Sequence, residues 1–302
     1  MGVALNASQT AQRLPWAELV GEIEALLHDP QVRIPKRIVM PTANGAVLFV
    51  MPACDARVAM TKLITLTPAN VGSDVPTIQG DVTVFDIATG ERRLILDGPT
   101  VTARRTAAVS VLAARRLAPN AAGPLLIVGA GVQGRAHLEA FAAVLGVQRF
   151  LIASRRAASA QRLVDRARSL GLLAERVPDT DAALTDCPLI VSCTPASGVV
   201  LRALPRPDAF IAAVGAFAPQ MVELAPGLCR HVAAHGRIVV DTREADHEAG
   251  DLLQADIDVA PLPTLGDVVR ADAHGSGRAP VLFKSCGWAG WDLAAARLAL
   301  RT

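Results

Sequence analysis

The sequence predicts an α/β protein that combines a doubly wound parallel sheet with a second, α+β domain. Three observations predict this fold. Short runs rich in Val, Ile and Leu dominate the first third of the chain, as in the strands of antiparallel sheets. Apolar strands and helices alternate from residue 125 onwards, as in parallel sheets with helices on both faces. A glycine-rich turn joins the first strand of that alternation to its helix.

Residues 1–117 are expected to form the α+β domain, with a mostly antiparallel sheet. Polar and apolar residues alternate on both sides of Thr89-Gly90, which predicts a hairpin. An alanine-rich helix is expected to end at Pro119. The expected elements are a helix at 14–28, strands at 37–40, 46–53 and 58–66, a hairpin at 81–98 and a helix at 102–119.

Residues 118–287 are expected to form the parallel α/β domain. The loop-forming residues of segment 120–124 separate it from the preceding helix. The chain then ends with an expected strand end, a turn and a helix at 283–300. The other expected elements are strands at 125–131, 149–154, 188–194, 209–216 and 236–241, and helices at 132–146 and 157–171.

The segment Gly129-Ala130-Gly131-Val132-Gln133-Gly134 is a complete G-x-G-x-x-G motif between an expected strand and helix. In dinucleotide-binding Rossmann domains, Gly129 would allow the tight turn and Gly131 the close approach of a pyrophosphate. Gly134 would let the helix pack on the strand, with the phosphate at the helix N-terminus. The alternative is a strand–helix turn that binds no ligand.

The end of the next strand predicts which coenzyme is bound. NAD sites place an acidic residue on the ribose about twenty residues after the glycines. Segment 149–158 contains no acid and carries Ser154, Arg155 and Arg156 instead. Guanidinium groups form charge-assisted bonds to phosphate, which favours NADPH over NADH. The alternative is chance, because arginine is common in this chain.

Arg37, Lys62 and Arg105 are candidate substrate-binding residues in the first domain. Lys62 interrupts the apolar run VAMTKLITL, where a solvated lysine is not expected. A lysine that points into a cleft can bind a carboxylate or donate a proton. A position on the outer face of the strand is equally compatible with the spacing. The chain has no tyrosine, so a tyrosine general acid is excluded.

Composition excludes several classes of function. The net charge of +2 is too small to indicate nucleic acid as a partner. No apolar run reaches the roughly eighteen residues of a membrane span, and the N-terminus lacks the pattern of a signal peptide. The five cysteines form no C-x-x-C pair and are expected to be reduced thiols of a cytoplasmic protein. His231 and His235 lack a third ligand, so no metal is expected.

Several short motifs extend over residues 30–300 in a specific order. They are Pro35-Lys36-Arg37, Met51-Pro52-Ala53, Lys62 with Pro68-Ala69-Asn70, residues 102–108 around Arg105, the Gly129–Gly134 turn, Val214-Gly215-Ala216-Phe217 with Pro219 and Glu223, and Phe283-Lys284-Ser285. Several of them are ordinary alone. Together they resemble the ornithine cyclodeaminase/mu-crystallin family.

The resemblance implies a homodimer with a small-molecule substrate and an active site between the two domains. The N-terminal domain, completed by a C-terminal helix at 288–302, would bind substrate and pair across the two-fold axis. Arg37, Lys62 and Arg105 match residues that hold the substrate carboxylate, and Lys62 and Arg105 are the catalytic candidates. The positions that match cofactor contacts are Gln79, Arg105, Val132, Gln133, Ser154, Arg155, Arg156, Cys193, Thr194, Val214 and Ser285.

One position departs from the cyclodeaminases of that family. They carry an aspartate, thought to be catalytic, where this chain has Phe217. Phenylalanine cannot accept a proton, so conversion of ornithine to proline is not expected unless Asp241 or Glu244 on the next loop supplies the base. We expect Phe217 to pack on the methylenes of the substrate ring.

Three functions therefore stay open. The sequence favours NADPH-dependent reduction of Δ1-pyrroline-2-carboxylate or Δ1-piperideine-2-carboxylate to L-proline or L-pipecolate, which the branch with phenylalanine resembles. The second function is an amino-acid dehydrogenase of the alanine type. The third is a ligand-binding protein that keeps the cofactor site but has little turnover.

Overall fold

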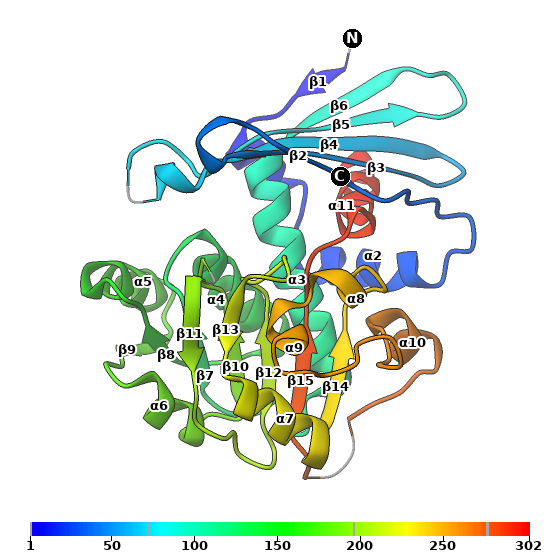
Figure 1. Ribbon diagram of the computed structural model, residues 1–302. Helices are drawn as coiled ribbons and strands as arrows, with labels where there is room; N and C mark the ends of the chain where they lie inside the picture. The colour runs from blue at the N-terminus through cyan, green and yellow to red at the C-terminus, as the bar shows by residue number, and fades with distance from the viewer. Residues whose placement is uncertain (1, 72, 196, 276–277) are drawn as a thin grey trace. The chain divides into compact units, whose positions relative to one another are not determined.

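The computed structural model describes residues 2–71, 73–195, 197–275 and 278–302, and its contacts divide the chain into two compact units. Unit 1 comprises Met1–Thr106 together with Trp288–Thr302, and unit 2 comprises Ala107–Gly287. The fold class predicted from the sequence is confirmed: a helix-covered parallel sheet accompanies a mixed unit with a mostly antiparallel sheet (Figure 1). Among the described residues, no helix is long and apolar enough to cross a membrane.

Unit 1 contains a six-stranded sheet in the order β1-β6-β5-β4-β3-β2. Neighbouring strands of this sheet pair antiparallel, except β1 and β6, which pair parallel. The predicted hairpin at 81–98 is confirmed, and its turn contains Gly90 with a positive φ of 69°. The strands are β1 (Val3–Ala4), β2 (Ile38–Pro41), β3 (Val47–Cys54), β4 (Val58–Leu66), β5 (Ile78–Asp86) and β6 (Arg92–Asp97).

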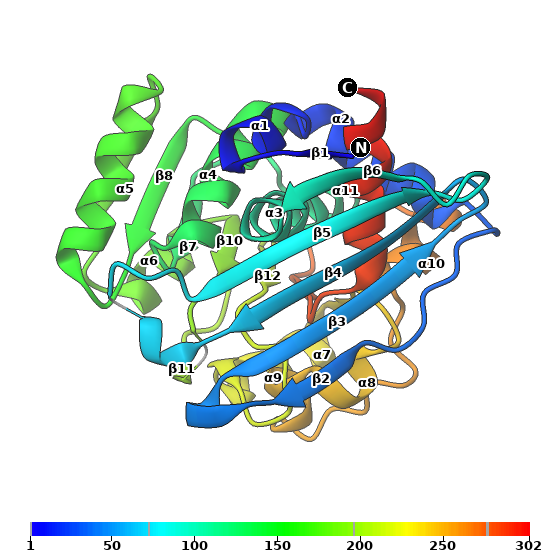
Figure 2. The ribbon, with the colours of Figure 1, turned by 90° about the horizontal axis from the view of Figure 1, so that it is seen from above.

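The C-terminal helix of the chain packs in unit 1, against β3, β4 and the helix at Trp16–Leu27. Figures 1 and 2 show it along one face of the sheet. Tight packing follows from its composition, because alanines alternate with large buried side chains such as Trp291 and Leu293. The helices that begin in unit 1 are α1 (Ala7–Gln12), α2 (Trp16–Leu27), the 3₁₀ turns η1 (Ala43–Gly45) and η2 (Pro68–Asn70), α3 (Gly98–Leu117), and α11 (Ala289–Arg301).

Unit 2 contains a seven-stranded sheet in the order β14-β15-β12-β10-β7-β8-β9, in which every neighbouring pair is parallel. The central strands are short and fully buried, as expected between two layers of helices. A separate pair, β11 and β13, was not anticipated from the sequence. The strands are β7 (Leu125–Val128), β8 (Arg149–Ala153), β9 (Leu173–Arg176), β10 (Leu189–Ser192), β11 (Ser197–Leu201), β12 (Phe210–Ala213), β13 (Val222–Leu224), β14 (Arg237–Val240) and β15 (Val281–Lys284).

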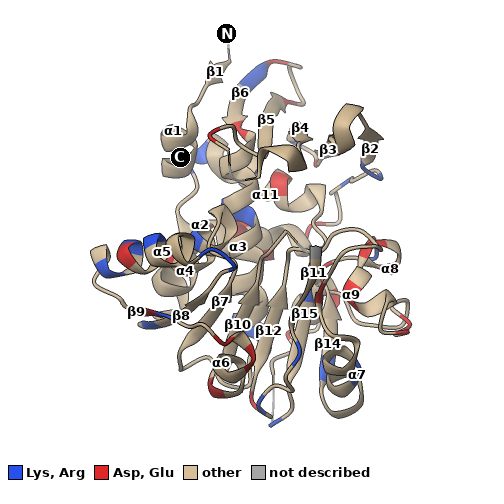
Figure 3. Cartoon of the chain, turned by 60° about the vertical axis from the view of Figure 1, so that its left-hand side comes forward, with Lys and Arg blue, Asp and Glu red and all other residues tan. Residues whose placement is uncertain are grey.

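The strand order of unit 2 reverses direction between β7 and β10, so the loops after these strands diverge to opposite faces of the sheet. Such a switch point at the carboxyl ends of the strands is where doubly wound sheets bind ligands. Figure 3 shows charge on the surrounding helices and none on β7, β10 or β12. The helices are α4 (Val132–Leu145), α5 (Ala157–Ser169), α6 (Thr180–Asp186), α7 (Pro226–His235), α8 (Ala245–Glu248), α9 (Gly250–Leu253) and α10 (Leu265–Arg270).

Candidate cofactor and substrate sites

The three motif glycines occupy three different environments in unit 2. Gly129 has a φ of +114°, and a Cβ there would lie 2.7 Å from the carbonyl oxygen of Cys193. A Cβ at Gly134 would lie 2.0 Å from the carbonyl oxygen of Gly129, so helix α4 packs directly on the turn. A Cβ at Gly131 would meet no atom within 4 Å. The turn and packing glycines are therefore obligatory, and Gly131 leaves open space at the helix N-terminus.

Open space and helix polarity together fit the pyrophosphate of a dinucleotide. Helix α4 begins at Val132, and its N-cap Gly131 has no side chain that could satisfy the first backbone N–H groups. Those N–H groups and the helix dipole favour a negative group at this end. Val132 is 70% exposed, which is unusual for a valine of a folded domain and leaves its surface available to a ligand.

His137 anchors the first turn of α4, a role that the sequence did not suggest. Its Nδ1 lies 2.8 Å from the carbonyl oxygen of Gln133, and its Nε2 lies 2.9 Å from the Ser110 hydroxyl. Complete burial lowers the pKa of His137 to about 4, so the ring is neutral at physiological pH. Nδ1 therefore donates to the carbonyl, and Nε2 accepts from Ser110.

The loop after β8 stands beside the glycine turn. Val128 and Ala153 are paired at the ends of β7 and β8, and the Gly129 N–H donates to the Ala153 carbonyl oxygen at 2.9 Å. Ser154, which follows, is half-buried. The next two residues, Arg155 and Arg156, are exposed before helix α5 begins. The predicted coenzyme-selecting residues thus follow directly after the strand end that is bonded to the glycine turn.

Cys193, at the end of β10, closes the other side of the turn. Its thiol donates to the carbonyl oxygen of Gly129 at 3.2 Å. Burial raises the pKa of Cys193 well above its usual range, with the Glu223 carboxylate adding to the effect. It is therefore a packing thiol and not a nucleophile.

Asp241 is a structural anchor, which argues against its role as an alternative base. It is almost fully buried, and its Oδ2 accepts hydrogen bonds from the Ser285 hydroxyl at 2.9 Å and from the N–H groups of Cys286 and Gly287. These bonds fix the loop after β15, which includes the predicted cofactor residue Ser285.

A buried charge cluster in unit 1 contains the substrate candidates. Lys62 shares the buried face of β4 with Met60 and Ile64 and is 1% exposed. Its Nζ lies 2.7 Å from Oδ2 of Asp292 on α11, and the Arg105 Nε lies 3.2 Å from Oδ1 of the same carboxylate. The alternative that the sequence left open, an outward-facing Lys62, is thereby excluded. We define Lys62, Arg105 and Asp292 as the buried charge cluster.

Lys62 has the electrostatics of a group that can exchange protons near neutrality. Burial lowers the pKa of Lys62 to about 8, against the opposing effect of Asp292. The positive charges of Arg105 and Arg37 lower the pKa further. A cation poised this close to physiological pH is typical of functional sites.

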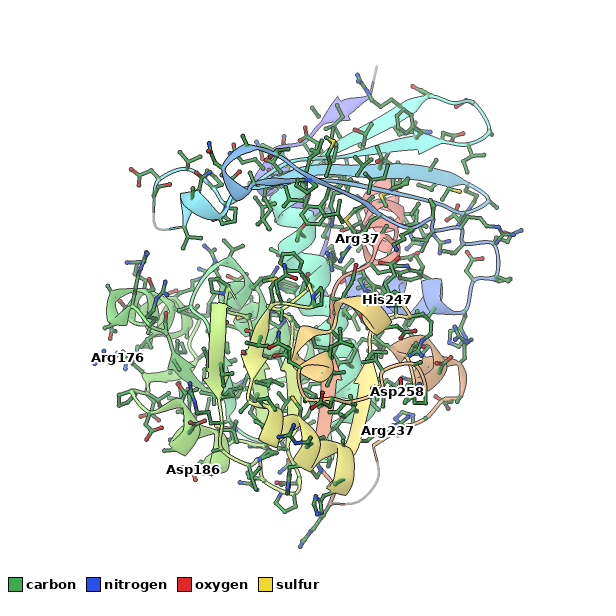
Figure 4. The ribbon with its side chains drawn as sticks, viewed as in Figure 1. Arg37, Arg176, Asp186, Arg237, His247 and Asp258 are labelled. Carbon is green, nitrogen blue, oxygen red and sulfur yellow. The ribbon has the colours of Figure 1, made fainter. Side chains whose placement is uncertain are left out.

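The remaining candidates lie at different places. Arg37 precedes β2, beneath the sheet of unit 1 in Figure 4, with its guanidinium 5.8 Å from the ring centroid of Phe49. Its positive charge contributes to lowering the pKa of Lys62. Gln79 is exposed at the start of β5. Phe217 is half-buried against the core of unit 2. The roles of all these residues stay predictions.

Residues 3–300 match the sequence profile of the ornithine cyclodeaminase/mu-crystallin family. The chain belongs to this family. Among its relatives is Δ1-pyrroline-2-carboxylate reductase 2 of Burkholderia ambifaria, 36% identical over 301 residues, which are 98% of this chain and 94% of the relative. The Δ1-pyrroline-2-carboxylate/Δ1-piperideine-2-carboxylate reductase of Azospirillum brasilense is also 36% identical, over 97% of this chain and 94% of its own length.

A solved structure shares the fold of this ornithine cyclodeaminase/mu-crystallin family member over almost its whole length. It is the Δ1-pyrroline-2-carboxylate reductase of Thermococcus litoralis, in complex with NADH and L-proline. The TM-score is 0.91 at 24% identity, covering 99% of this chain and 96% of the other.

Sequence reasoning missed Asp292, the carboxylate that joins the two catalytic candidates of this family member. The available signal was weak: an acidic residue within the apolar segment WAGWDLAAARLAL near the C-terminus. It also missed the buried acids Glu223 and Asp251 and the buried Lys284 as interacting groups. Lys284 and Glu223 were noted only as members of matching motifs, without partners.

Proposed function

We propose that this family member reduces Δ1-pyrroline-2-carboxylate or Δ1-piperideine-2-carboxylate to L-proline or L-pipecolate with NADPH. The observation that carries the proposal is the buried charge cluster, in which Lys62 and Arg105 share the Asp292 carboxylate. Buried cations held in fixed positions suit the recognition of a small anionic substrate. Relatives 36% identical over nearly the whole chain are named as reductases of these two imino acids.

The chain is an NAD(P)H-dependent oxidoreductase that acts on a C=N bond. The proposal adds the substrate and the preference for the phosphorylated coenzyme. When bound, NADPH supplies the hydride. The open space at Gly131 and the N-terminus of α4 would hold its pyrophosphate, and Arg155 and Arg156 would hold the 2′-phosphate.

The charge cluster performs two tasks in this proposal. Arg105, with the fork geometry of a guanidinium, binds the substrate carboxylate, and Arg37 assists it. Lys62 adds a point charge and, with its pKa lowered to about 8, holds a proton at neutral pH that keeps the imine nitrogen protonated. Protonation makes the imine carbon electron-poor, so fixing the ring in one orientation is the main remaining requirement.

Phe217 supports imine reduction over cyclodeamination. It packs against the core of unit 2 and offers an apolar surface without a proton acceptor. We propose that this surface covers the ring methylenes and excludes water. Ornithine cyclodeamination requires a base at this place, and the alternative base Asp241 already accepts three hydrogen bonds at one oxygen.

Unit 1 presents an apolar strand that favours the homodimer implied by the family resemblance. All four residues of edge strand β2 are exposed, and Ile38, Val39 and Met40 are each about half exposed. An exposed apolar edge strand invites pairing with another chain. We propose a homodimer that covers this edge, and a cytoplasmic location consistent with five cysteines that form no disulfide.

An assay of the purified protein with NADPH and Δ1-pyrroline-2-carboxylate tests the proposed function. We expect rapid oxidation of NADPH and formation of L-proline. Activity only with pyruvate and ammonia would identify an alanine-type dehydrogenase, and cofactor binding without turnover would identify a binding protein. Release of ammonia from ornithine at a rate that rivals imine reduction would overturn the assignment.

Replacing Arg155 and Arg156 together by alanine is expected to weaken NADPH binding more than NADH binding. The wild type is expected to prefer NADPH at least about tenfold in kcat/KM, or about 1.4 kcal/mol, and the double variant to lose that preference. Steady-state kinetics with both coenzymes measure the effect. Arg162→Ala, which removes another exposed arginine from α5, is the control. Equal use of both coenzymes by the wild type would contradict the prediction.

A further inference from the structure

One buried carboxylate links two loops at the carboxyl edge of the unit 2 sheet. Glu223, on β13, is fully buried. Its Oε1 accepts hydrogen bonds from the Ser192 hydroxyl at 2.7 Å, the Thr194 N–H at 2.7 Å and the Thr194 hydroxyl at 2.8 Å. Its Oε2 accepts from the Gly215 N–H at 2.7 Å. Glu223 therefore ties the loop after β10 to the loop after β12.

The two loops approach each other too closely for another side chain. A Cβ added at Gly215 would lie 2.2 Å from the Thr194 carbonyl oxygen and 2.6 Å from Cδ of Glu223. Glycine is thus required where the two loops meet. At this point one carboxylate bridges backbone N–H groups from both loops.

A second buried pair fixes Glu223 itself. Asp251 accepts hydrogen bonds from the N–H groups of Glu223 at 2.6 Å and Leu224 at 2.9 Å. Its other oxygen lies 2.9 Å from Nζ of Lys284, which also donates to the Ala216 carbonyl oxygen at 2.6 Å. Lys284 is fully buried at the end of β15. The network thereby joins β13, β15 and the loop after β12.

Such a network is poorly explained by stability alone. Buried ions gain little over well-packed apolar residues because both partners must leave water. Buried polar networks instead fix one arrangement of the groups that they connect. The groups connected here are loops at the carboxyl ends of β10, β12 and β15, the edge where a doubly wound sheet binds its dinucleotide. Cys193, Thr194 and Val214 of these loops are among the predicted cofactor contacts.

We propose that Glu223 is a positioning residue that sets the spacing of the loops after β10 and β12 for the nicotinamide half of the coenzyme. The inference rests on the proposed coenzyme site but not on the identity of the imino acid. Glu223 acts through the backbone of Thr194 and Gly215, and Asp251 with Lys284 keeps it in place.

Glu223→Gln is the most direct test, because glutamine keeps the size and replaces one acceptor oxygen by an NH₂ donor. Either Thr194 N–H or Gly215 N–H then faces a donor. Calorimetric titration is expected to show NADPH binding weakened about tenfold or more, because a charge-assisted bond is lost. Binding of 2′,5′-ADP, which lacks the nicotinamide half, is expected to stay within about twofold of the wild type.

One control variant and a pair of variants at Thr194 separate positioning from general stability. Glu139→Gln makes the same change at a carboxylate bonded by Arg135 and Arg166, and is expected to bind both ligands as the wild type does. Thr194→Val removes one donor to Glu223 and is expected to show a smaller loss of the same kind, even if Glu223→Gln does not fold. Thr194→Ser, which keeps the hydroxyl, is expected to bind NADPH as the wild type does.

Unchanged NADPH binding in both Glu223→Gln and Thr194→Val would overturn the proposal, as would equal weakening of NADPH and 2′,5′-ADP. A wild type that reduces no cyclic imine would refute only the proposed substrate, because the binding comparison does not involve it. If the wild type prefers NADH, the same variants are titrated with NADH and with ADP. Glu223→Gln is then expected to weaken NADH binding and to leave ADP binding nearly unchanged.

Discussion

Lys62→Met is expected to lower kcat/KM for Δ1-pyrroline-2-carboxylate about a hundredfold or more, equivalent to about 2.7 kcal/mol of transition-state stabilisation. Methionine fills the buried space of the lysine without its charge, so the loss reports on the ammonium group and not on a cavity. Asp292 keeps its contact with Arg105 in this variant. Steady-state kinetics measure the loss. Lys36→Met, at an exposed lysine of the same unit, is the matched control.

The pH dependence of the wild type gives an independent check on Lys62. Its pKa is lowered to about 8, so the ammonium form dominates below that pH and is lost above it. We expect kcat/KM to fall as the pH rises through about 8, because the substrate loses a cationic partner and its proton source. The residual activity of Lys62→Met is expected to lack this basic limb. A variant with near-normal turnover and an unchanged profile would remove Lys62 from the mechanism.

Most of the fold could be predicted because its signals are local. The strand predicted at 58–66 is β4 itself, and the strand and helix on either side of the glycine turn begin at their expected residues, Leu125 and Val132. Short elements without a long periodic pattern were missed, including β1, β9 and helices α8 to α10. Two residues of β1 or four of α9 are too few to show a period.

The candidate site likewise contains residues whose roles could be predicted from local sequence and residues whose partners could not. The roles of Gly129, Gly131 and Gly134 follow from their spacing within one turn, so the sequence predicts them. The partners of Lys62 could not be predicted from the sequence. Asp292 lies on a helix near the other end of the chain and contacts β4 only in the folded unit. The hydrogen bonds of Glu223 could not be predicted either. Backbone N–H groups donate two of them, and every residue except proline has such a group, so the residue types do not indicate these bonds.

Asp292→Asn is expected to destabilise the protein by about 3 to 5 kcal/mol, because it leaves the buried cations of Lys62 and Arg105 without their shared counterion. Urea denaturation measures the change in the free energy of unfolding. Asp272→Asn removes an exposed partner of Arg116 and is the control, with little expected change in the free energy of unfolding because the pair is screened by solvent. In the wild type, Asp292 raises the pKa of Lys62 against burial. The basic limb of the Asp292→Asn pH profile is therefore expected to move to lower pH.

Combining Asp292→Asn with Lys62→Met distinguishes a coupled charge cluster from two independent buried residues. In the double variant, one of the two uncompensated cations is gone, so Arg105 alone remains to be accommodated. The double variant is expected to be more stable than Asp292→Asn while staying as inactive as Lys62→Met. Contacting residues typically show coupling energies of about 0.5–3 kcal/mol, and a value in this range would place both side chains in one electrostatic unit. Simple addition of the two single effects would instead show that Lys62 and Asp292 do not depend on each other, and the proposed substrate cluster would be wrong.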